Sequence, residues 1–404
     1  MAKLHFNDIE FKEEGGKIKG AFLRNFYFEI SKAEMKKLGS YEVNKGDILV
    51  NGDENKIRRN FNTILEQKLK GLKSAFGKPA VYIYPGLIPL IGSLYFGVID
   101  RNTNIIEVRP ITGCNLSCMF CSVDLCRRER DFVVNVDYLV KEVEKLVMLK
   151  REKTKEIEIH INAQGEPLLY APLVEMISKL KKIKGVKTIS MDTNGTLLDE
   201  DKIDELVDAG ITRFNVSLNA FSHEAANKIA GTAYPLEHVK KICRYIAKTC
   251  DILIAPVWMQ GLNDGDIEQM IGFAKELKEL RPKQKVPIIG IQNFLEYDFG
   301  KKPCREITFD EFYRKLAGLE KKHGIKLILS REDFGITACK VLKKPFDRDD
   351  YVKAKVICDG KFKGEKLCSA HDRIVSVQTN VKEGRQIGVR ITRSKYNVFY
   401  GREI

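Results

Sequence analysis

The sequence has no long hydrophobic run. No stretch approaches the roughly 18 consecutive apolar residues of a membrane-spanning helix. The opening segment, MAKLHFNDIEFKEEGGKIKG, also lacks the apolar core of a secretory signal. We therefore expect a cytoplasmic protein with no membrane partner.

Cysteine is missing from residues 1–113, although the chain contains 10 cysteines. Without a secretory signal, these cysteines are better explained as reduced thiols and metal ligands than as a disulfide framework. The sequence also has no internal repeat and no low-complexity tract. With 404 residues, 44% of them apolar, the chain is long enough for two or three domains with a sizeable core.

Positive charge is unevenly distributed. The net charge is +14, and residues 340–404 contain 16 Lys and Arg against 8 Asp and Glu, so this tail contributes +8 of it. Such a concentration of cations suits an anionic partner. In the rest of the chain, the mixture of Lys and Glu is explained by a solvated surface.

From about Asn104 onward, short β-branched runs alternate with helical patterns whose apolar residues recur at intervals of three and four. This alternation predicts the α/β class, with a partial (β/α)6 TIM-like barrel over residues 104–338. In such a barrel the chemistry lies at the carboxyl ends of the strands. The candidate strands are 105–112, 156–167, 187–195, 213–220, 251–260 and 287–294, and the helical segments between them include 136–149, 171–183, 199–210 and 236–248.

Two flanking regions have different patterns. Residues 1–103 predict an N-terminal α+β extension, with a strand-like segment at 21–30, a helix at 55–76 and an extended segment at 79–92. The segment KVLKKPFDRDD ends the strand-helix pattern. Beyond it, short alternating runs separated by Gly predict a small all-β barrel over residues 339–404.

Three cysteines follow the first candidate strand with CxxxCxxC spacing: Cys114, Cys118 and Cys121. Three thiolates bind three irons of a cubane cluster, and the absence of a fourth nearby ligand leaves one iron open. The alternatives are a zinc site or three buried thiols. Structural zinc, however, prefers four ligands in paired CxxC knuckles, and packing does not explain three cysteines within eight residues.

This spacing, on this loop and with Phe120 just before the third cysteine, resembles the radical S-adenosylmethionine (SAM) superfamily. The resemblance implies a 4Fe-4S cluster whose open iron binds the amino and carboxylate groups of SAM. It also implies an electron donor such as ferredoxin or flavodoxin, and a 5'-deoxyadenosyl radical that abstracts hydrogen from the substrate. The barrel would hold the substrate near this radical and exclude water.

The resemblance continues along the strand ends, from about residue 105 to residue 329. Gln164-Gly165-Glu166-Pro167 resembles the GGEP motif of the family, with Gln164 in place of its first Gly. Each polar set alone could be an ordinary loop cap, but sets at four successive strand ends argue for one shared ligand. The residues expected to contact SAM are Phe120, Gln164, Gly165, Glu166, Asp192, Asn194, Ser217, Asn219 and Gln260.

Four later cysteines leave two interpretations open. Cys304, Cys339, Cys358 and Cys368 could bind an auxiliary cluster, but their gaps of 35, 19 and 10 resemble no local knuckle. A pool of metal-free thiols is the favoured interpretation. His160 lies in an apolar strand without the spacing of a metal ligand, and a structural role is expected for it.

The basic tail resembles the TRAM domain of RNA-modifying enzymes. The resemblance is carried by an early KPF, the GKFKGE turn and the closing VRITRSKYNVFYG. Cations interleaved with Phe362, Tyr396 and Phe399 would serve RNA phosphates and bases. The alternative is a solvated β domain with core aromatics. The expected RNA-binding residues are Lys361, Lys363, Arg373, Arg390, Arg393 and Lys395.

A radical SAM barrel joined to a TRAM domain is the arrangement of the methylthiotransferases. The absence of cysteine from residues 1–113 leaves the sulfur-donating cluster of those enzymes in doubt. We therefore expect a radical SAM enzyme that modifies RNA, with tRNA favoured and DNA not expected as a partner. The alternatives are a radical SAM enzyme acting on a protein or small metabolite, and an RNA-binding protein with a structural cluster.

Overall fold

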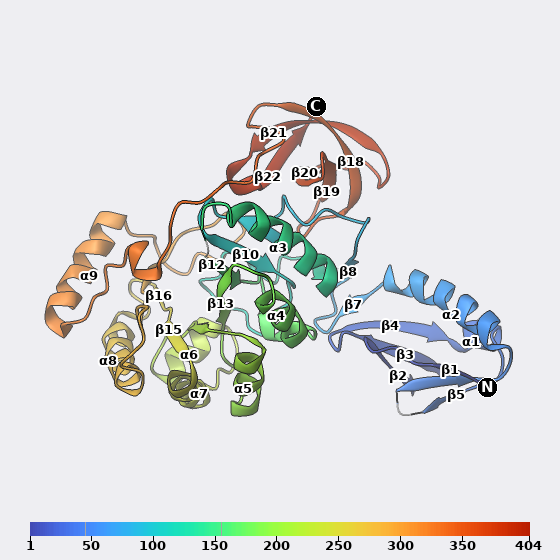
Figure 1. The fold of residues 1–404 in the computed structure, drawn as a ribbon, viewed down its shortest axis with the longest axis horizontal. Coiled ribbons are helices and arrows are strands. Elements are labelled where there is room, and N and C mark those ends of the chain that lie inside the picture. The colour runs from blue at the N-terminus through green and yellow to red at the C-terminus, as the bar shows by residue number, and fades with distance from the viewer. Residues whose placement is uncertain (45, 155) are drawn as a thin grey trace.

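The centre of the molecule is a six-stranded sheet flanked by helices, in a computed structural model that describes residues 1–404 except 45 and 155 (Figure 1). The edge strand β9 is antiparallel to β10, and the other neighbouring strands pair in parallel. In sheet order the strands are β15 (Asp251–Ile254), β14 (Arg213–Val216), β13 (Val186–Thr193), β12 (Ile157–Ile161), β10 (Ile105–Arg109) and β9 (Gly97–Asp100).

The predicted α/β class is confirmed, and five of the six candidate strands lie in this sheet. The sixth candidate strand, 287–294, is reduced to a bridge between Ile289 and Ile254 and to β17 (Gln292–Asn293). β17 pairs in parallel with β16 (Val257–Trp258) rather than with the sheet itself. The described sheet is therefore open, because its outermost strands β9 and β15 do not pair with each other.

Four helices of this region, α3, α5, α6 and α9, begin at side-chain caps. Asn135, Asp199, Ser222 and Thr308 each accept a hydrogen bond from the backbone N–H three residues later. None of the helices in the described residues has the length and hydropathy needed to cross a bilayer. The helices are α3 (Val136–Lys150), α4 (Leu173–Lys181), α5 (Glu200–Ala209), α6 (His223–Ala230), α7 (Leu236–Thr249), α8 (Asp264–Leu280) and α9 (Phe309–His323).

The N-terminal unit has two small antiparallel sheets and two helices, α1 (Lys32–Lys36) and α2 (Glu54–Leu69). The single strand predicted at 21–30 is wrong, because Leu23 and Arg24 have positive φ angles and turn the chain into a hairpin. The sheets are β1 (Ala2–Leu4), β6 (Asp47–Val50) and β5 (Tyr41–Asn44), and β2 (Ile9–Glu14), β3 (Lys17–Phe22), β4 (Phe26–Ser31) and β7 (Lys73–Ser74).

Two strands from residues 80–100 support the central region. The edge strand β9 belongs to the central sheet, and β8 (Ala80–Ile83) pairs in parallel with β11 (Asp131–Val134). Since β11 directly follows the segment that contains the three cysteines, β8 fixes one end of that segment. The predicted division of the chain at residues 103 and 338 stays a prediction.

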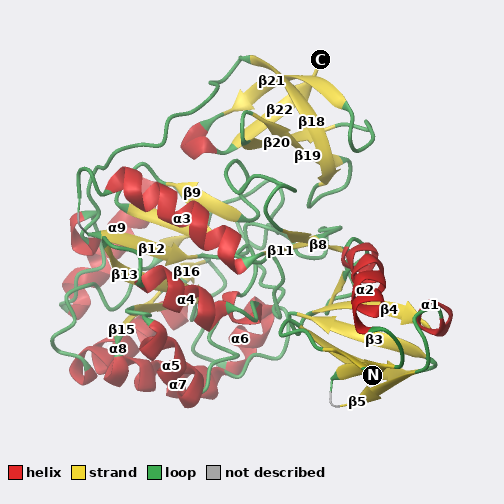
Figure 2. Ribbon diagram, turned by 45° about the vertical axis from the view of Figure 1, so that its right-hand side comes forward, coloured by secondary structure: helices red, strands yellow, loops and turns green. Residues whose placement is uncertain are grey.

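The C-terminal region forms a closed five-stranded barrel, as predicted, and lies above the central sheet (Figure 2). Phe399 is fully buried in the core of this barrel, so its predicted role as an RNA-stacking ring is wrong. Around the barrel the strands are β18 (Tyr351–Asp359), β19 (Glu365–Ala370), β20 (Arg373–Gln378), β22 (Phe399–Glu403) and β21 (Gln386–Arg393).

Candidate active site

The cysteine loop, residues 110–130, connects β10 to β11 at the carboxyl end of the central sheet. The carboxyl end of α6 supports it from one side. The N–H of Ser117 donates to the carbonyl of Ala230 at 3.0 Å, and that of Met119 donates to Ile229 at 2.9 Å. The three cysteines of this loop are half-buried.

The QGEP turn, residues 164–167, supports the cysteine loop from another side. The N–H of Glu166 donates to the carbonyl of Gly113 at 2.7 Å. A Cβ atom at Gly165 would lie 2.1 Å from the same carbonyl oxygen. Only glycine permits this approach, so the turn after β12 is held directly beside Cys114.

Glu166 joins this turn to the end of β13. Its carboxylate is buried and accepts hydrogen bonds from the hydroxyl of Thr193 at 2.8 Å, from the N–H of Asn194 at 2.9 Å and from that of Leu168 at 3.2 Å. Burial raises the pKa of Glu166 to about 7, against the effect of these hydrogen bonds. The structure thus shows Glu166 bonded within the chain, and its predicted contact with SAM stays a prediction.

A cavity of about 30 Å³ brings several of the predicted SAM contacts together. Its lining includes Phe120, Asn194, Ser217 and Asn219, together with Cys118. The side chain of Asn194 also donates to that of Asn115 at 3.0 Å, which connects the end of β13 to the cysteine loop.

Asn219 and Gln260 differ from the other predicted SAM contacts. The amide oxygen of Asn219 accepts from the N–H of Val257 at 2.8 Å, and therefore holds the end of β14 to β16. Gln260 is exposed and lines a separate hollow with Thr308 and Glu311. The structure does not bring Gln260 to the cavity beside Cys118.

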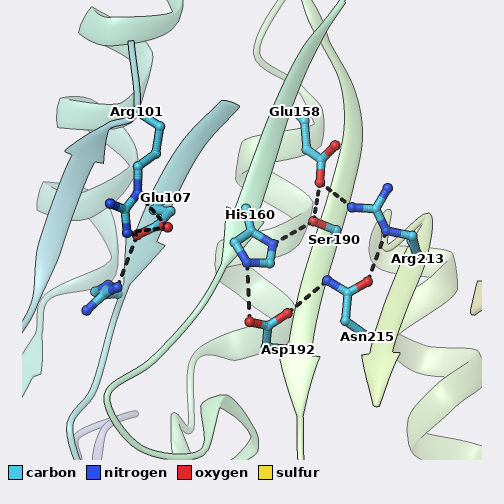
Figure 3. Close-up of polar contacts among 9 residues, drawn as sticks. Arg101, Glu107, Glu158, His160, Ser190, Asp192, Arg213 and Asn215 are labelled. Atoms are coloured by element: carbon cyan, nitrogen blue, oxygen red, sulfur yellow. Dashed lines mark hydrogen bonds and ion pairs between the residues drawn. The ribbon is translucent and has the colours of Figure 1, made fainter. Parts of the chain in front are cut away.

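A polar network crosses the central sheet and was not predicted from the sequence (Figure 3). Glu158 accepts from Arg213 and from the hydroxyl of Ser190, both at 2.5 Å. His160 contacts Ser190 at 2.9 Å and Asp192 at 3.3 Å. Asp192 also accepts from Asn215 at 2.8 Å.

Alternation along the strands is the signal that could have predicted this network. Glu107 and Arg109 alternate with Ile106 and Val108 on β10, and the polar residues of the next three strands are spaced in the same way. Alternate residues point to opposite faces of a sheet. One face therefore presents apolar side chains, and the other presents paired charges.

Neighbouring charges shift the pKa values of His160 and Asp192 in this network. The nearby Asp192, Glu158 and Glu107 carboxylates raise the pKa of His160, although burial has the opposite effect. Burial also acts against ionisation of Asp192, but His160, Asn215 and Arg213 lower its pKa. Both shifts favour the charged forms of the pair, the imidazolium of His160 and the carboxylate of Asp192.

The C-terminal barrel also reaches this end of the sheet, through the turn that connects β18 to β19. Lys361 is fully buried, and its ammonium group donates to the side-chain oxygen of Gln164 at 2.9 Å. Phe362 is buried and stacks on Phe299, with ring centroids 4.2 Å apart. The predicted RNA contacts of Lys361 and Phe362 are therefore wrong, because this turn of the barrel is buried against the QGEP turn and the segments around the cysteine loop.

The other predicted RNA-binding residues lie nearer the surface. Lys363, Arg390, Arg393 and Lys395 are exposed, although Arg390 pairs with Asp349 at 2.9 Å. Arg373 is half-buried, and burial lowers its pKa. Their role in RNA binding stays a prediction.

The three cysteines of the loop fit a cubane cluster by their spacing and their common loop. Burial raises the pKa of Cys118, and so do the negative charges of its neighbours Cys114 and Cys121. Within the part of the chain that the structure describes, no three Cys, His, Asp or Glu side chains form a ready-made metal site.

The four later cysteines lie in different surroundings. Cys358 and Cys368 are on the adjacent strands β18 and β19, whereas the thiol of Cys339 donates to the carbonyl of Lys150. Cys304 lies beyond β17, near the carboxylates of Asp264 and Glu296. This placement gives no support to an auxiliary cluster.

Comparison with known proteins identifies the class that uses such a loop. The model of the radical SAM superfamily matches residues 108–274, which include the cysteine loop, the QGEP turn and the strand ends of β13 and β14. An uncharacterized protein of Methanocaldococcus jannaschii is 38% identical over 83% of this chain and 84% of its own length.

Two further relatives have named activities. The "Probable GTP 3',8-cyclase" of Thermococcus kodakarensis is 27% identical over 63% of this chain and 84% of its own length. The GTP 3',8-cyclase of Clostridium botulinum is 28% identical over 44% of this chain, and the match spans 54% of that relative. Among solved structures, TYW1 with a lysine-pyruvate adduct bound is 20% identical, with a TM-score of 0.41 over 60% of this chain and 81% of that chain.

The match to the superfamily model and the cysteine loop define an iron–sulfur enzyme. The chain belongs to the radical SAM superfamily. Its cofactors are accordingly a 4Fe-4S cluster and SAM, and its chemistry requires a reductant.

Proposed function

We propose that Cys114, Cys118 and Cys121 bind the 4Fe-4S cluster and leave one iron for SAM. The observation that carries this proposal is the position of the cysteine loop, between the QGEP turn and the end of α6. When bound, the cluster and SAM supply a 5'-deoxyadenosyl radical that removes hydrogen from the substrate. Ferredoxin or flavodoxin is the proposed electron donor.

The neighbouring strand ends would position SAM. The backbone at Gln164 and Gly165 lies beside the cysteine loop, and Phe120, Asn194 and Ser217 line the cavity next to Cys118. Backbone carbonyls would accept from the ammonium of SAM, and the aromatic ring would pack on its apolar surface. Glu166 would act indirectly, by holding the ends of β12 and β13 together.

The polar network would position the substrate. The side chain of Asp192 is 39% exposed, whereas that of its partner His160 is 17% exposed. Asp192 is therefore the member of this pair that is more available to a ligand, and its lowered pKa keeps it ready to accept hydrogen bonds from substrate hydroxyls.

A nucleotide is the proposed substrate class. Support comes from the relatives named as GTP 3',8-cyclases, whose matches cover 44% and 63% of this chain. A carboxylate that accepts hydrogen bonds from hydroxyls, as Asp192 would, suits a ribose.

The test is anaerobic incubation of reconstituted enzyme with SAM, dithionite and single nucleoside triphosphates, with 5'-deoxyadenosine measured by chromatography. We expect one nucleotide to increase its release at least tenfold and, if deuterated at the reacting carbon, to transfer deuterium to it. Release that no nucleotide increases would contradict the nucleotide proposal, while the radical chemistry would stand.

RNA is the second candidate substrate, with tRNA favoured. It is supported by the resemblance to TRAM and by a groove of about 800 Å³ whose lining includes Lys343, Lys344, Arg348, Arg393 and Lys395. However, Asn102 also lines this groove and lies two residues beyond the end of β9, which is antiparallel to β10, so the groove lies at the end of the sheet opposite the cysteine loop. Mass spectrometry of tRNA nucleosides from a strain without the gene tests this candidate, and an unchanged profile would contradict it.

A further inference from the structure

The turn between β18 and β19 is rigidly built around Glu365. One carboxylate oxygen of Glu365 accepts from the N–H groups of Lys361 at 2.9 Å and Phe362 at 3.3 Å, and the other accepts from the hydroxyl of Tyr95 at 2.8 Å. A Cβ atom at Gly360 would lie 2.4 Å from this carboxylate. The direction of the Lys361 side chain is therefore fixed by buried contacts on both sides.

The same turn packs on the segments that cover the cysteine loop. Phe362 stacks on Phe299, and a Cβ atom on the next residue, Gly300, would lie 2.9 Å from the carbonyl of Cys121. The carbonyl of Lys361 also accepts from the N–H of Glu129, near the end of the cysteine loop, at 2.9 Å. The barrel turn thus contacts the cysteine loop directly at Glu129, and through Phe299 it contacts the segment that lies against Cys121.

Lys361 lacks the counterion that a buried ammonium group normally has. Its partners are two oxygens of Gln164, at 2.9 and 3.4 Å, and the ring of Tyr95, and all three are neutral. Among the described residues, no carboxylate lies within 4.0 Å of it. By contrast Lys150, which is equally buried, pairs with Asp100 at 2.6 Å.

The surroundings of Lys361 increase the need for negative charge. Burial lowers the pKa of Lys361 to about 7, and the positive charges of Arg128 and Arg109 act in the same direction. The groups that raise its pKa are Cys121 and Asp131, and Asp131 already pairs with Arg128 at 2.8 Å. Burying an unpaired charge costs several kcal/mol, so such a site is expected to face an anion.

We propose that Lys361 provides the positive charge that balances the thiolate-ligated cluster, which makes the C-terminal barrel part of the active site. This inference rests on the cluster assignment proposed above. A cluster with three thiolate ligands is anionic, and it becomes more so when it accepts an electron. A nearby cation stabilises the reduced form and makes reduction easier. Lys361 is thus a positioning and charge-balancing residue, and does not react itself.

The test compares four full-length, anaerobically reconstituted proteins: wild type, Lys361→Met, Lys361→Arg and Lys363→Met. The midpoint potential of the cluster is measured without SAM, by titration followed with electron paramagnetic resonance. For Lys361→Met we expect the equilibrium constant for reduction to fall about tenfold, a shift of about 59 mV for one electron. Lys361→Arg keeps the charge and should stay near wild type. Lys363→Met removes an exposed cation two residues away and should change nothing.

Three results would overturn the proposal. One is an unchanged potential in a Lys361→Met protein with a full iron content. Another is an equal shift in the Met and Arg variants, since charge would then not be the cause. The third is a change confined to the dissociation constant of SAM, which would assign Lys361 to the carboxylate of SAM instead. A wild-type protein without an iron cubane would refute the cluster assignment itself, so the two failures are distinguishable.

Discussion

The two ends of the C-terminal barrel use the same residue types in opposite ways. At one end, Lys361 and Phe362 are buried against the segments around the cysteine loop. At the other end, Arg393 and Lys395 are exposed around an open groove, and the ammonium group of Lys395 lies over the ring of Tyr396. A lysine next to an aromatic residue can therefore be either buried or exposed in this barrel.

The difference follows from what each end contacts. The β18–β19 turn meets the carboxyl end of the central sheet beside the cysteine loop, where burial makes a single unpaired charge costly. The groove meets the opposite end of the sheet, where water screens each charge and several cations must act together. We therefore expect substitutions at the inner turn to alter the cluster, and substitutions at the groove to alter only the binding of anions.

The largest effect should come from the cysteine loop, and it should leave the groove untouched. Cys118→Ala is expected to abolish the visible absorbance of the reconstituted cluster and all release of 5'-deoxyadenosine, because the cluster loses one of three ligands. Cys126→Ala is the control, since this exposed cysteine lies on the same loop and should be dispensable. Retention of both signals by Cys118→Ala would refute the ligand assignment.

Removing the aromatic contact between the barrel and the central region should have the next largest effect. Phe362→Ala deletes a buried ring that stacks on Phe299, and we expect it to lower the free energy of unfolding by about 3 kcal/mol. Phe309→Ala is the matched control, because that ring is 51% exposed and should cost much less. Equal losses in chemical denaturation would show that the turn does not anchor the barrel.

A smaller, pH-dependent effect is expected inside the central sheet. The raised pKa of His160 means that its pairing with Asp192 stabilises the fold fully below pH 6.5 and is lost as the pH rises through the folded pKa. His160→Gln should therefore cost about 2 kcal/mol at pH 6 and clearly less at pH 9. The exposed His223→Gln is the control in thermal melts. A cost for His160→Gln that is independent of pH would contradict the charged pair.

The cysteine loop and the QGEP turn could be predicted because their information is local. Cys114, Cys118 and Cys121 lie within eight residues, and a Gly-Glu-Pro turn directly follows a strand. The parallel order of the strands then brings these loops to one end of the sheet. Gln260 was grouped with them by the same argument, but the chain after β16 takes it to a separate hollow.

The role of Lys361 could not be predicted, because it depends on a contact with Gln164 across 197 positions of the sequence. From composition alone, Lys361 is predicted to bind RNA together with exposed cations such as Lys363. The network of Glu158, His160 and Arg213 was missed for a different reason. Its alternating polar residues are visible in the sequence, but buried ion pairs become evident only when adjacent strands are in register.

The smallest effect on the fold should come from the groove, and it gives the sharpest contrast with the inner turn. Replacing both Arg393 and Lys395 with Ser should change the free energy of unfolding by about 0.5 kcal/mol or less, because both side chains are exposed. SAM cleavage and the cluster potential should be unchanged. If the groove binds RNA, the salt dependence of tRNA binding should fall by about two phosphate contacts. A loss of SAM cleavage in this variant would mean that the two ends of the barrel are coupled, since no described contact connects these residues to the cysteine loop.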